Sequence, residues 1–289
     1  MDPQAIERAG EHFNNARNTI KALNPEDLPE ECRPRTADEG HQVLAVHLNK
    51  ARQSISGDIT GYKIGLVSSV QRDFIGGTEA LGFDSPLYAG VLSGRIFTGS
   101  TTVPFEQTIS PFIEGEFAVR MGKDVPLDGA PYTRDSISEY VESCMAGIEL
   151  VDPRLNFMKF PKPWGPLFIA DDGGNWGLVI GEDITNWRDY DMAAAKCTLT
   201  KNGEVIAEGV GADLLGHPFE VLAWQANDMI GRGETLKTGD VSLLGSVTPS
   251  YTDIAPNDEL VCAWDVIGSC SVKYVGELPA QMGAALKKD

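Results

Sequence analysis

Residues 197–209, CTLTKNGEVIAEG, show most directly how this chain folds. Polar and apolar residues alternate on both sides of Asn202-Gly203, as they do in strands that bury one face. Asn and Gly accept the positive φ angles that a two-residue turn between antiparallel strands requires. The stretch therefore predicts a β-hairpin whose turn lies at Asn202 and Gly203.

Further short strands follow toward the C-terminus. The stretches GDVSLLGSV (239–247), DELVCAWD (258–265) and SCSVKYVG (269–276) are separated by turn-forming residues, as in a sheet built from short strands. From about residue 103 onward the chain is predicted to be mostly strand, with helical interruptions at about 136–146 and 218–231. This part of the chain therefore predicts a mixed β domain.

The first hundred residues are more mixed. Thr36 and Glu39 have the spacing of a helix-capping box ahead of apolar residues at helical intervals, which predicts a helix over about 36–53. GYKIGLVS (61–68) predicts a short strand, and residues 76–94 predict a helix followed by a long loop or irregular strands. We therefore predict an α+β protein.

Two divisions of the chain are consistent with these patterns. One has a helical or mixed N-terminal region over residues 1–100 and a mixed β catalytic domain over residues 101–289. The other is a single continuous domain, because the sequence contains no obvious linker, internal repeat or low-complexity segment.

The composition excludes several classes of protein. The chain has 289 residues, and its 42 acidic and 24 basic residues give a formal charge of −18, which repels phosphate backbones and anionic membranes. No apolar run reaches the roughly 18 residues of a membrane span. The five cysteines form no CxxC pair, which argues against a disulfide framework or a zinc site. We expect a cytoplasmic protein with free thiols that binds neither nucleic acid nor membrane.

Carboxylates inside apolar strands indicate a candidate site. In IEGEFAV (113–119), Glu114 and Glu116 point to the same face of a strand, and Glu149 lies in a second apolar run. A solvated strand face would explain one such pair. Buried acids instead need a cation, and an oxygen-rich set of ligands suits Mg²⁺ or Mn²⁺ better than zinc or copper.

Lys63 and His217 each allow two interpretations. Lys63 lies in the middle of the apolar strand GYKIG, where it either reaches solvent or acts near a metal-bound enolate as an acid–base group or electrostatic clamp. His217 precedes Pro218 at the start of a predicted helix, so we interpret it as a capping or packing residue rather than a catalytic one.

Six stretches together resemble a known family of enzymes. They are GYKIGLVSS (61–69), IEGEFAVRMGKDVP (113–126), AGIELVDPR (146–154), IADDGGNWGLVIG (169–181), KNGEVIAEGVGADLLGHPFEVLAWQAN (201–227) and LKTGDVSLLGSVTP (236–249). In this order they resemble the 2-keto-4-pentenoate hydratase and 2-oxohept-3-enedioate hydratase group of the fumarylacetoacetate hydrolase superfamily. The resemblance implies a mixed β-roll with flanking helices, assembled as a homo-oligomer.

The resemblance also implies roles for particular residues. The family's metal-binding E-x-E motif falls on Glu114 and Glu116, its third acidic ligand falls on Glu149, and its active-site lysine falls on Lys63. The segment of the family that lines the substrate pocket, and its GSLT turn, imply four substrate-binding residues: Asp171, Asp172, Ser246 and Thr248. The implied cofactor is Mg²⁺, with Mn²⁺ as the alternative.

Two departures from the family pattern affect the expected reaction. Many hydratases have an aspartate in the loop before GVL that is thought to help catalysis, whereas this chain has Leu87 there. The change from ADNAS to ADDGGNW adds a charge and places Trp176 near the implied pocket. Both departures concern the reaction and the substrate rather than the three predicted metal ligands.

The function implied first is addition of water to a 2-hydroxy- or 2-oxo-dienoate, giving a 4-hydroxy-2-oxoalkanoate, during catabolism of aromatic compounds. Alternatives within the superfamily are decarboxylation of a 2-oxo-enedioate and hydrolysis of an acylpyruvate. A third hypothesis is a non-catalytic oligomeric subunit. The expected partners are a small-molecule dienoate, further copies of the chain and, as an additional hypothesis, a neighbouring enzyme of the pathway.

Overall fold

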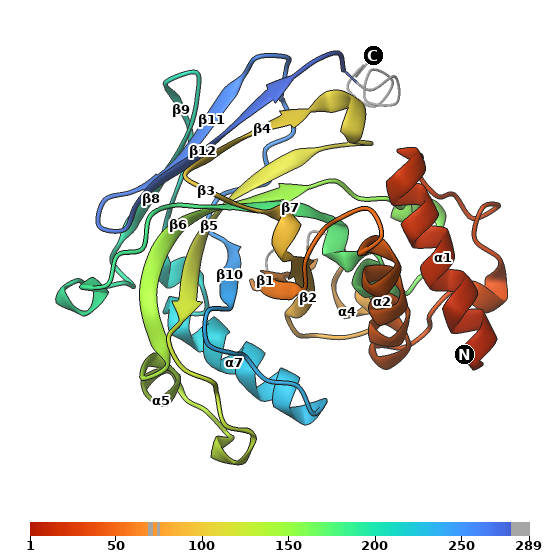
Figure 1. The fold of residues 1–289 in the computed structure, drawn as a ribbon, viewed down its shortest axis with the longest axis horizontal. Helices are drawn as coiled ribbons and strands as arrows, with labels where there is room; N and C mark the ends of the chain where they lie inside the picture. Colours follow the sequence, from red (N-terminus) through yellow and green to blue (C-terminus); the bar gives the residue numbers. More distant parts are fainter. Residues whose placement is uncertain (69–71, 74–75, 279–289) are drawn as a thin grey trace.

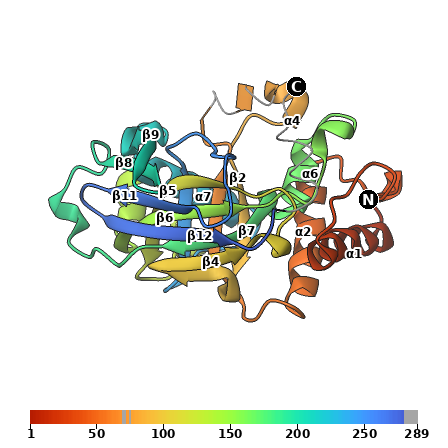
Figure 2. The same cartoon turned by 90° about the horizontal axis from the view of Figure 1, so that it is seen from above.

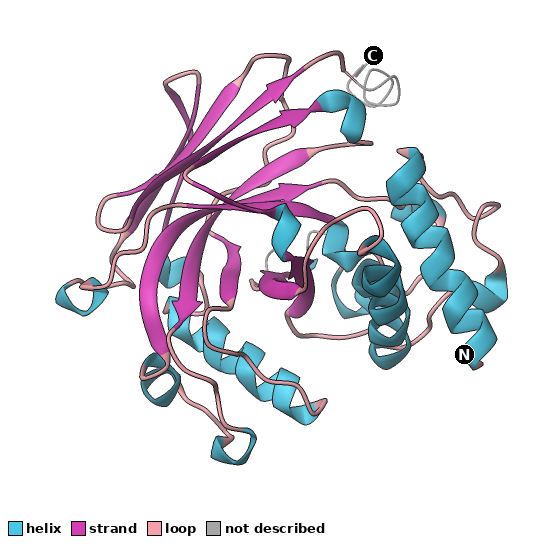
Figure 3. Cartoon of the chain, in the orientation of Figure 1, coloured by secondary structure: helices cyan, strands magenta, loops and turns pink. Residues whose placement is uncertain are grey.

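A computed structural model describes residues 1–68, 72–73 and 76–278. Two sheets make up most of the molecule, and the N-terminal helices lie at one side of them (Figures 1 and 3). Ser69, the last residue of the GYKIGLVSS motif, lies outside the described residues. Within the described part, no helix has the length and apolar character needed to cross a membrane.

Among the described residues, the larger sheet has seven strands in the order β2-β1-β10-β5-β6-β7-β3. It joins strands from before and after residue 100, so it crosses the predicted boundary between regions. The β1–β10 and β3–β7 pairs are parallel and the other pairs are antiparallel. The strands are β1 (Ile59–Gly65), β2 (Leu87–Leu92), β3 (Ile96–Thr98), β5 (Phe112–Met121), β6 (Val141–Val151), β7 (Asn175–Ile180) and β10 (Val241–Ser246).

This sheet curls into a roll. Strand β2, at one edge, contacts β7, which lies next to the other edge. Inside the roll, Gly61 lets β1 lie close to Ile96 of β3, because a Cβ on residue 61 would lie 2.6 Å from Ile96 Cδ1. Apolar side chains such as Met145, Leu178 and Leu243 form a buried cluster with members from β5, β6, β7 and β10. The predicted α+β class and mixed β-roll are confirmed.

The smaller sheet has five strands in the part of the chain that the structure describes, in the order β4-β12-β11-β8-β9. Asn202 and Gly203 have φ angles of 52° and 86°, so the predicted hairpin turn between β8 and β9 is confirmed. The strands are β4 (Ser100–Pro104), β8 (Lys196–Lys201), β9 (Glu204–Val210), β11 (Glu259–Trp264) and β12 (Gly268–Val275).

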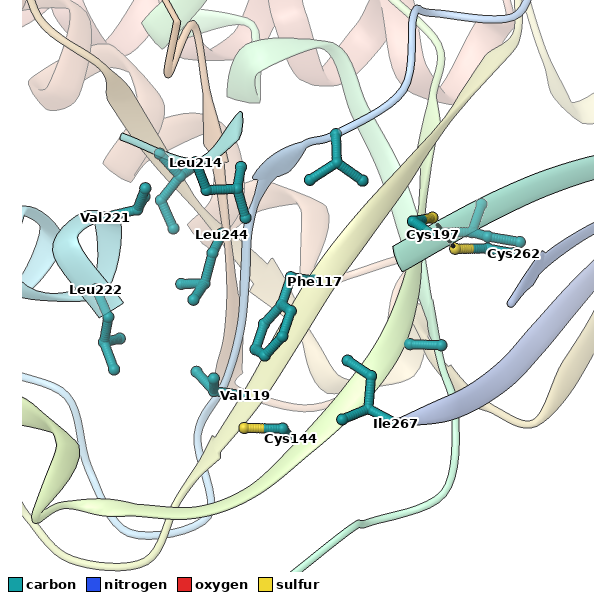
Figure 4. Close-up of a cluster of buried hydrophobic side chains, with 14 of the residues drawn as sticks. Phe117, Val119, Cys144, Cys197, Leu214, Val221, Leu222, Leu244, Cys262 and Ile267 are labelled. Carbon is teal, nitrogen blue, oxygen red and sulfur yellow. Dashed lines mark hydrogen bonds between the residues drawn. The ribbon is translucent and has the colours of Figure 1, made fainter. Parts of the chain in front are cut away.

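The main hydrophobic core lies between the two sheets and helix α7 (Pro218–Gly231). Figure 4 shows Phe117 of β5 between apolar side chains of α7 on one side and Cys197 and Cys262 of the smaller sheet on the other. The Sγ atoms of these two cysteines are 3.5 Å apart. All five cysteines are free thiols, as predicted, and all five are buried. His217 caps α7 by accepting a hydrogen bond from the Phe219 N–H at 3.1 Å, which confirms its structural interpretation.

The N-terminal helices pack beside the roll (Figure 2). The Thr36 side chain accepts the Glu39 N–H as predicted, but the Glu39 carboxylate accepts the Arg35 N–H instead of completing a capping box. Helix α1 contacts α2, and α2 in turn contacts α6. The α-helices in the described part of the chain are α1 (Pro3–Thr19), α2 (Ala37–Ala51), α4 (Gly77–Leu81), α5 (Arg134–Ser138), α6 (Gly165–Ala170) and α7.

The predicted helix over about 136–146 is wrong. The chain forms the short helix α5, which ends at Ser138, and then enters β6 at Val141. Apolar residues at 137, 141, 144, 145 and 148 imitate helical spacing, because nearly all of β6 is buried and both of its faces carry apolar residues. Pairing with β5 on one side and β7 on the other satisfies the backbone of this strand and overrides the helical pattern.

Candidate active site

Three carboxylates converge at the predicted site from two neighbouring strands. Glu114 of β5 pairs directly with Glu149 of β6, and Glu116 lies two residues farther along the same face of β5. One carboxylate oxygen from each residue lies within 4.8 Å of the others. Glu116 and Glu149 are 0% exposed and Glu114 is partly exposed. A solvated strand face therefore does not explain the cluster.

The Glu116 carboxylate is fixed by the backbone of β10. Its Oε2 accepts the Gly245 N–H at 3.0 Å, whereas its Oε1 has no hydrogen-bond partner in the described part of the chain. Gly245 has a φ angle of 104°, which a residue with a side chain rarely adopts. The Ser250 hydroxyl donates to Glu114 Oε1 at the partly exposed end of the cluster.

The Glu149 carboxylate receives two donors on one oxygen. Its Oε1 lies 3.1 Å from Lys63 Nζ and accepts the Asn175 side-chain amide at 3.1 Å. Its Oε2 is buried without a partner among the residues described. Lys63 also donates to the Gly173 carbonyl at 3.3 Å. Four elements, β1, β6, the 172–174 turn and β7, therefore fix this corner of the site.

Burial and mutual repulsion shift the pKa values of the cluster. Burial, together with Glu149 and Glu114, raises the pKa of Glu116 well above its usual value. Burial raises the pKa of Glu149 to about 7, although Lys63 acts in the opposite direction. Burial alone would lower the pKa of Lys63, but the three carboxylates outweigh it and raise that pKa, so Lys63 stays protonated at neutral pH.

The residues of this cluster fit a divalent cation. Two buried carboxylate oxygens lack a donor, and buried acceptors of this kind are costly unless something pairs with them. When all three acids are ionised, their charge exceeds that of the single Lys63 ammonium by two, which equals the charge of Mg²⁺ or Mn²⁺. All of the donor atoms are oxygens, the type that these hard cations prefer.

Asp171 and Asp172, predicted to bind substrate, lie outside the carboxylate cluster. Asp171 accepts the Arg154 backbone N–H at 2.8 Å and lies 3.3 Å from the Arg154 guanidinium, so its charge is neutralised locally. Asp172 pairs with Arg17 of α1 at 3.2 Å, and its Oδ1 is buried without a described partner. Asp172 begins the 172–174 turn that presents the Gly173 carbonyl to Lys63. Contact with substrate remains a prediction for both acids.

Ser246 and Thr248 lie beside Glu116, where β10 ends. Ser246 is the register partner of Glu116, and the Thr248 hydroxyl accepts the Gly115 N–H at 2.9 Å. The Ser246 hydroxyl donates to the Thr248 carbonyl. These bonds join the end of β10 to β5 and thereby position Glu116, and substrate contact remains a prediction for both residues.

Leu87 lies on the Lys63 side of the site. A Cβ placed on Gly65 would lie 3.1 Å from Lys63 Nζ and 3.7 Å from Leu87 Cδ1. The position where the family pattern has an aspartate therefore holds a buried apolar side chain near the ammonium.

Sequence reasoning missed the role of Asn175. Its amide donates to Glu149 Oε1, but the residue sits in the ADDGGNW stretch without a charge or an apolar pattern that would draw attention. The available signal was an amide at the first position of a buried strand, directly after two glycines. Buried amides need partners, so such a residue is a reasonable candidate to support a nearby ligand.

The chain is similar to known proteins over most of its length. Residues 94–275 match the family model described as Fumarylacetoacetate (FAA) hydrolase C-terminal. The chain is 28% identical to the 2-hydroxyhexa-2,4-dienoate hydratase of Comamonas testosteroni over 94% of this chain and 98% of that protein. It is 30% identical to the 2-keto-4-pentenoate hydratase of Burkholderia vietnamiensis (strain G4 / LMG 22486), over 86% and 89% of the two chains.

A solved structure shows the same fold over almost the whole chain. The 4-oxalocrotonate decarboxylase from Pseudomonas putida G7, complexed with magnesium and adipate, matches with a TM-score of 0.82 and 23% identity. The match covers 95% of this chain and 99% of that one. The N-terminal helices and both sheets therefore belong to one shared architecture.

Proposed function

The chain belongs to the fumarylacetoacetate hydrolase family, within its 2-keto-4-pentenoate hydratase group, and from this premise we propose that it adds water to a 2-hydroxy- or 2-oxo-dienoate. The product would be a 4-hydroxy-2-oxoalkanoate, and the reaction would serve the catabolism of aromatic compounds. We propose Mg²⁺ as the cofactor, with Mn²⁺ as the alternative, held by Glu114, Glu116 and Glu149.

The observation that carries this proposal is the pair of unpartnered carboxylate oxygens on Glu116 and Glu149, next to the ammonium of Lys63. Bound there, a divalent cation would supply Lewis acidity toward the oxygens of a 2-oxo acid and stabilise an enolate. The chain prepares this chemistry by fixing its ligands: the Gly245 N–H holds Glu116, and the Asn175 amide holds Glu149.

Lys63 is the residue that we propose as catalytic. Hydration of a dienol requires a proton on the carbon chain before water can add at the distal carbon of the resulting unsaturated ketone. The protonated Lys63 can relay that proton or stabilise the negative charge that develops on the substrate. Its contacts with Glu149 Oε1 and with the Gly173 carbonyl hold the buried ammonium beside the carboxylate cluster.

Decarboxylation of a 2-oxo-enedioate is the second candidate function. The observation that favours it is Leu87, which gives the Lys63 side of the site no carboxylate at the position of the family's loop aspartate. Loss of CO₂ from such a substrate needs enolate stabilisation but no activated water, so an apolar neighbour is compatible with it.

Product analysis distinguishes these functions. Purified protein with Mg²⁺ is incubated separately with 2-hydroxypenta-2,4-dienoate and with a 2-oxo-enedioate, and the products are identified by mass. We expect the dienoate to gain one water and the enedioate to remain unchanged, with no reaction in matched samples that contain EDTA. Loss of CO₂ from the enedioate without hydration of the dienoate would replace the proposal with the decarboxylase. No turnover of either compound would support the non-catalytic subunit.

Assembly and location remain proposals as well. We propose a homo-oligomer, since the family resemblance implies one, and a cytoplasmic location, since all five cysteines are free thiols, as is usual in a reducing compartment. Association with a neighbouring enzyme of the same pathway is a further proposal.

A further inference from the structure

A polar cavity lies apart from the carboxylate cluster. Its volume is about 190 Å³, and its lining includes the side chains of Arg17 from α1, Arg95 from the turn before β3, and Arg154 after β6. The lining also includes apolar residues, among them Ile109 and Trp176, and the polar residues Asn18, Ser54 and Gln107. Three guanidinium groups around one small cavity call for an explanation, because like charges repel in partly buried surroundings.

Two of the three arginines already have carboxylate partners. Arg17 pairs with Asp172 at 3.2 Å, and Arg154 pairs with Asp171 at 3.3 Å. Arg154 also donates to the backbone carbonyls of Asp171 and Asn175. These pairs belong to the framework that holds the 172–174 turn, and they account for the charge of Arg17 and Arg154.

Arg95 differs from the other two. Its guanidinium carbon lies 3.7 Å from the centroid of the Trp176 ring, so the planar group stacks on the indole. Within residues 1–68, 72–73 and 76–278, the Arg95 side chain has no hydrogen-bond or ion-pair partner. Burial and the nearby Arg154 lower its pKa to about 10, so it is still protonated at neutral pH. A charged fork of N–H donors therefore borders the cavity without an acceptor.

Asp152, the acid that also lines the cavity, does not neutralise Arg95 by contact. Its Oδ1 accepts the backbone N–H groups of Ile109 and Ser110 at 2.8 and 2.7 Å. These bonds hold the loop before β5 against the end of β6, so Asp152 has a structural task of its own. Within the described residues, no carboxylate therefore contacts the Arg95 guanidinium, and the charge of Asp152 acts on it only at a distance.

We propose that this cavity binds the carboxylate group of a small monocarboxylic acid, with Arg95 as the residue that recognises it. A guanidinium fork matches the two oxygens of a carboxylate, and stacking on Trp176 holds the fork in place. Ile109 and the indole offer an apolar surface for a short hydrocarbon body. The volume is many times the roughly 10–15 Å³ that a single water needs, which leaves room for an acid of a few carbons.

The cavity is a different site from the carboxylate cluster, although the two are neighbours. Arg17 of the cavity pairs with Asp172, and the carbonyl of the next residue, Gly173, accepts the Lys63 ammonium. A substrate that binds through a metal would bind at Glu114, Glu116 and Glu149 and would not occupy the cavity at Arg95. The inference therefore stands independently of the proposed function, and removal of metal separates the two sites experimentally.

Calorimetric titration of the full chain, freed of metal with EDTA, tests the proposal with sodium butyrate as the probe. Butyrate has a carboxylate and a short apolar body but no 2-oxo group for chelation. Ionic strength is held constant with sodium chloride, and inorganic phosphate is titrated in parallel. We expect saturable binding of one butyrate per chain, weaker binding of phosphate, and an affinity at least about tenfold lower in Arg95→Gln, because the charged fork is lost.

Two further variants complete this experiment. Arg95→Lys keeps the charge but loses the fork, so its affinity should fall between those of the unaltered chain and Arg95→Gln. Glu149→Gln alters the carboxylate cluster and should bind butyrate as the unaltered chain does. Absence of saturable binding, phosphate binding more tightly than butyrate, unchanged affinity in Arg95→Gln, or loss of binding in Glu149→Gln would each overturn the proposal. If Arg95→Gln does not fold, as judged by circular dichroism, unchanged affinity in Arg95→Lys overturns it.

Discussion

Replacing Lys63 with methionine is expected to lower kcat roughly 10²- to 10⁴-fold, the range for loss of a positioned acid–base group. Methionine has a similar length and no charge, so it fills the space between Glu149 and Gly173 without an ammonium. Metal affinity should be unchanged or higher, because the variant removes a cation that competes for Glu149 Oε1. The measurements are dienoate turnover by absorbance and Mg²⁺ binding by calorimetry.

A surface lysine provides the matched control. Lys237 pairs with Asp124 at an exposed position, so Lys237→Met removes the same charge away from the site and should retain full turnover. If Lys63→Met kept most of its activity, Lys63 would not be catalytic. If Lys63→Met lost its metal together with its activity, the residue would act through the metal site rather than on the substrate.

Glu116→Gln and Glu149→Gln are each expected to abolish turnover and to weaken Mg²⁺ binding by roughly 100-fold or more, beyond the usual effect of altering a residue that only supports a ligand. The change keeps the shape of the side chain and removes one ionised oxygen ligand. Glu142→Gln is the control, because Glu142 lies on the same strand, β6, with its side chain exposed. A variant of Glu116 or Glu149 that stayed fully active in EDTA would refute the proposed metal site.

Thermal unfolding separates loss of the metal from loss of the fold in these two variants. The pKa of Glu149 is about 7 in the folded chain, above its usual value, because burial disfavours the ionised form. In the metal-free chain this carboxyl group therefore favours folding at low pH, and its contribution is lost as the pH rises through about 7. Without metal at pH 8, Glu149→Gln should melt at the same temperature as the unaltered chain or higher. It should not show the increase in melting temperature that Mg²⁺ gives the unaltered chain.

Much of the site could be predicted because strand geometry is regular. Glu114 and Glu116 share a face because side chains repeat every two residues along a strand. Acidic residues in two separate apolar runs, with Glu149 in the second run, indicated that the two runs would meet. The structure brings them together, since Glu114 and Glu149 are direct partners across β5 and β6. Lys63 was a more open case, because a single lysine in an apolar strand can also reach solvent.

Other parts depend on contacts between distant segments, which sequence periodicity does not carry. The segment that forms β6 has apolar residues at helical intervals, but it is a strand because it pairs with β5 and β7. The neutralisation of Asp171 by Arg154 and of Asp172 by Arg17 requires α1 and the 172–174 turn to meet. The family resemblance placed both acids in a substrate pocket. The sequence could not show that each acid already forms an ion pair with an arginine.

Titration of the EDTA-treated chain with Mg²⁺, with turnover of 2-hydroxypenta-2,4-dienoate followed in the same samples, tests the proposed metal site directly. We expect no turnover without the ion and activity that rises in proportion to one bound ion per chain. The affinity should increase from about pH 5.5 to pH 8, since burial raises the pKa of Glu149 to about 7 and also raises that of Glu116, and both must lose their protons to bind. Full turnover in EDTA, with no divalent ion bound to the protein, would contradict the proposal.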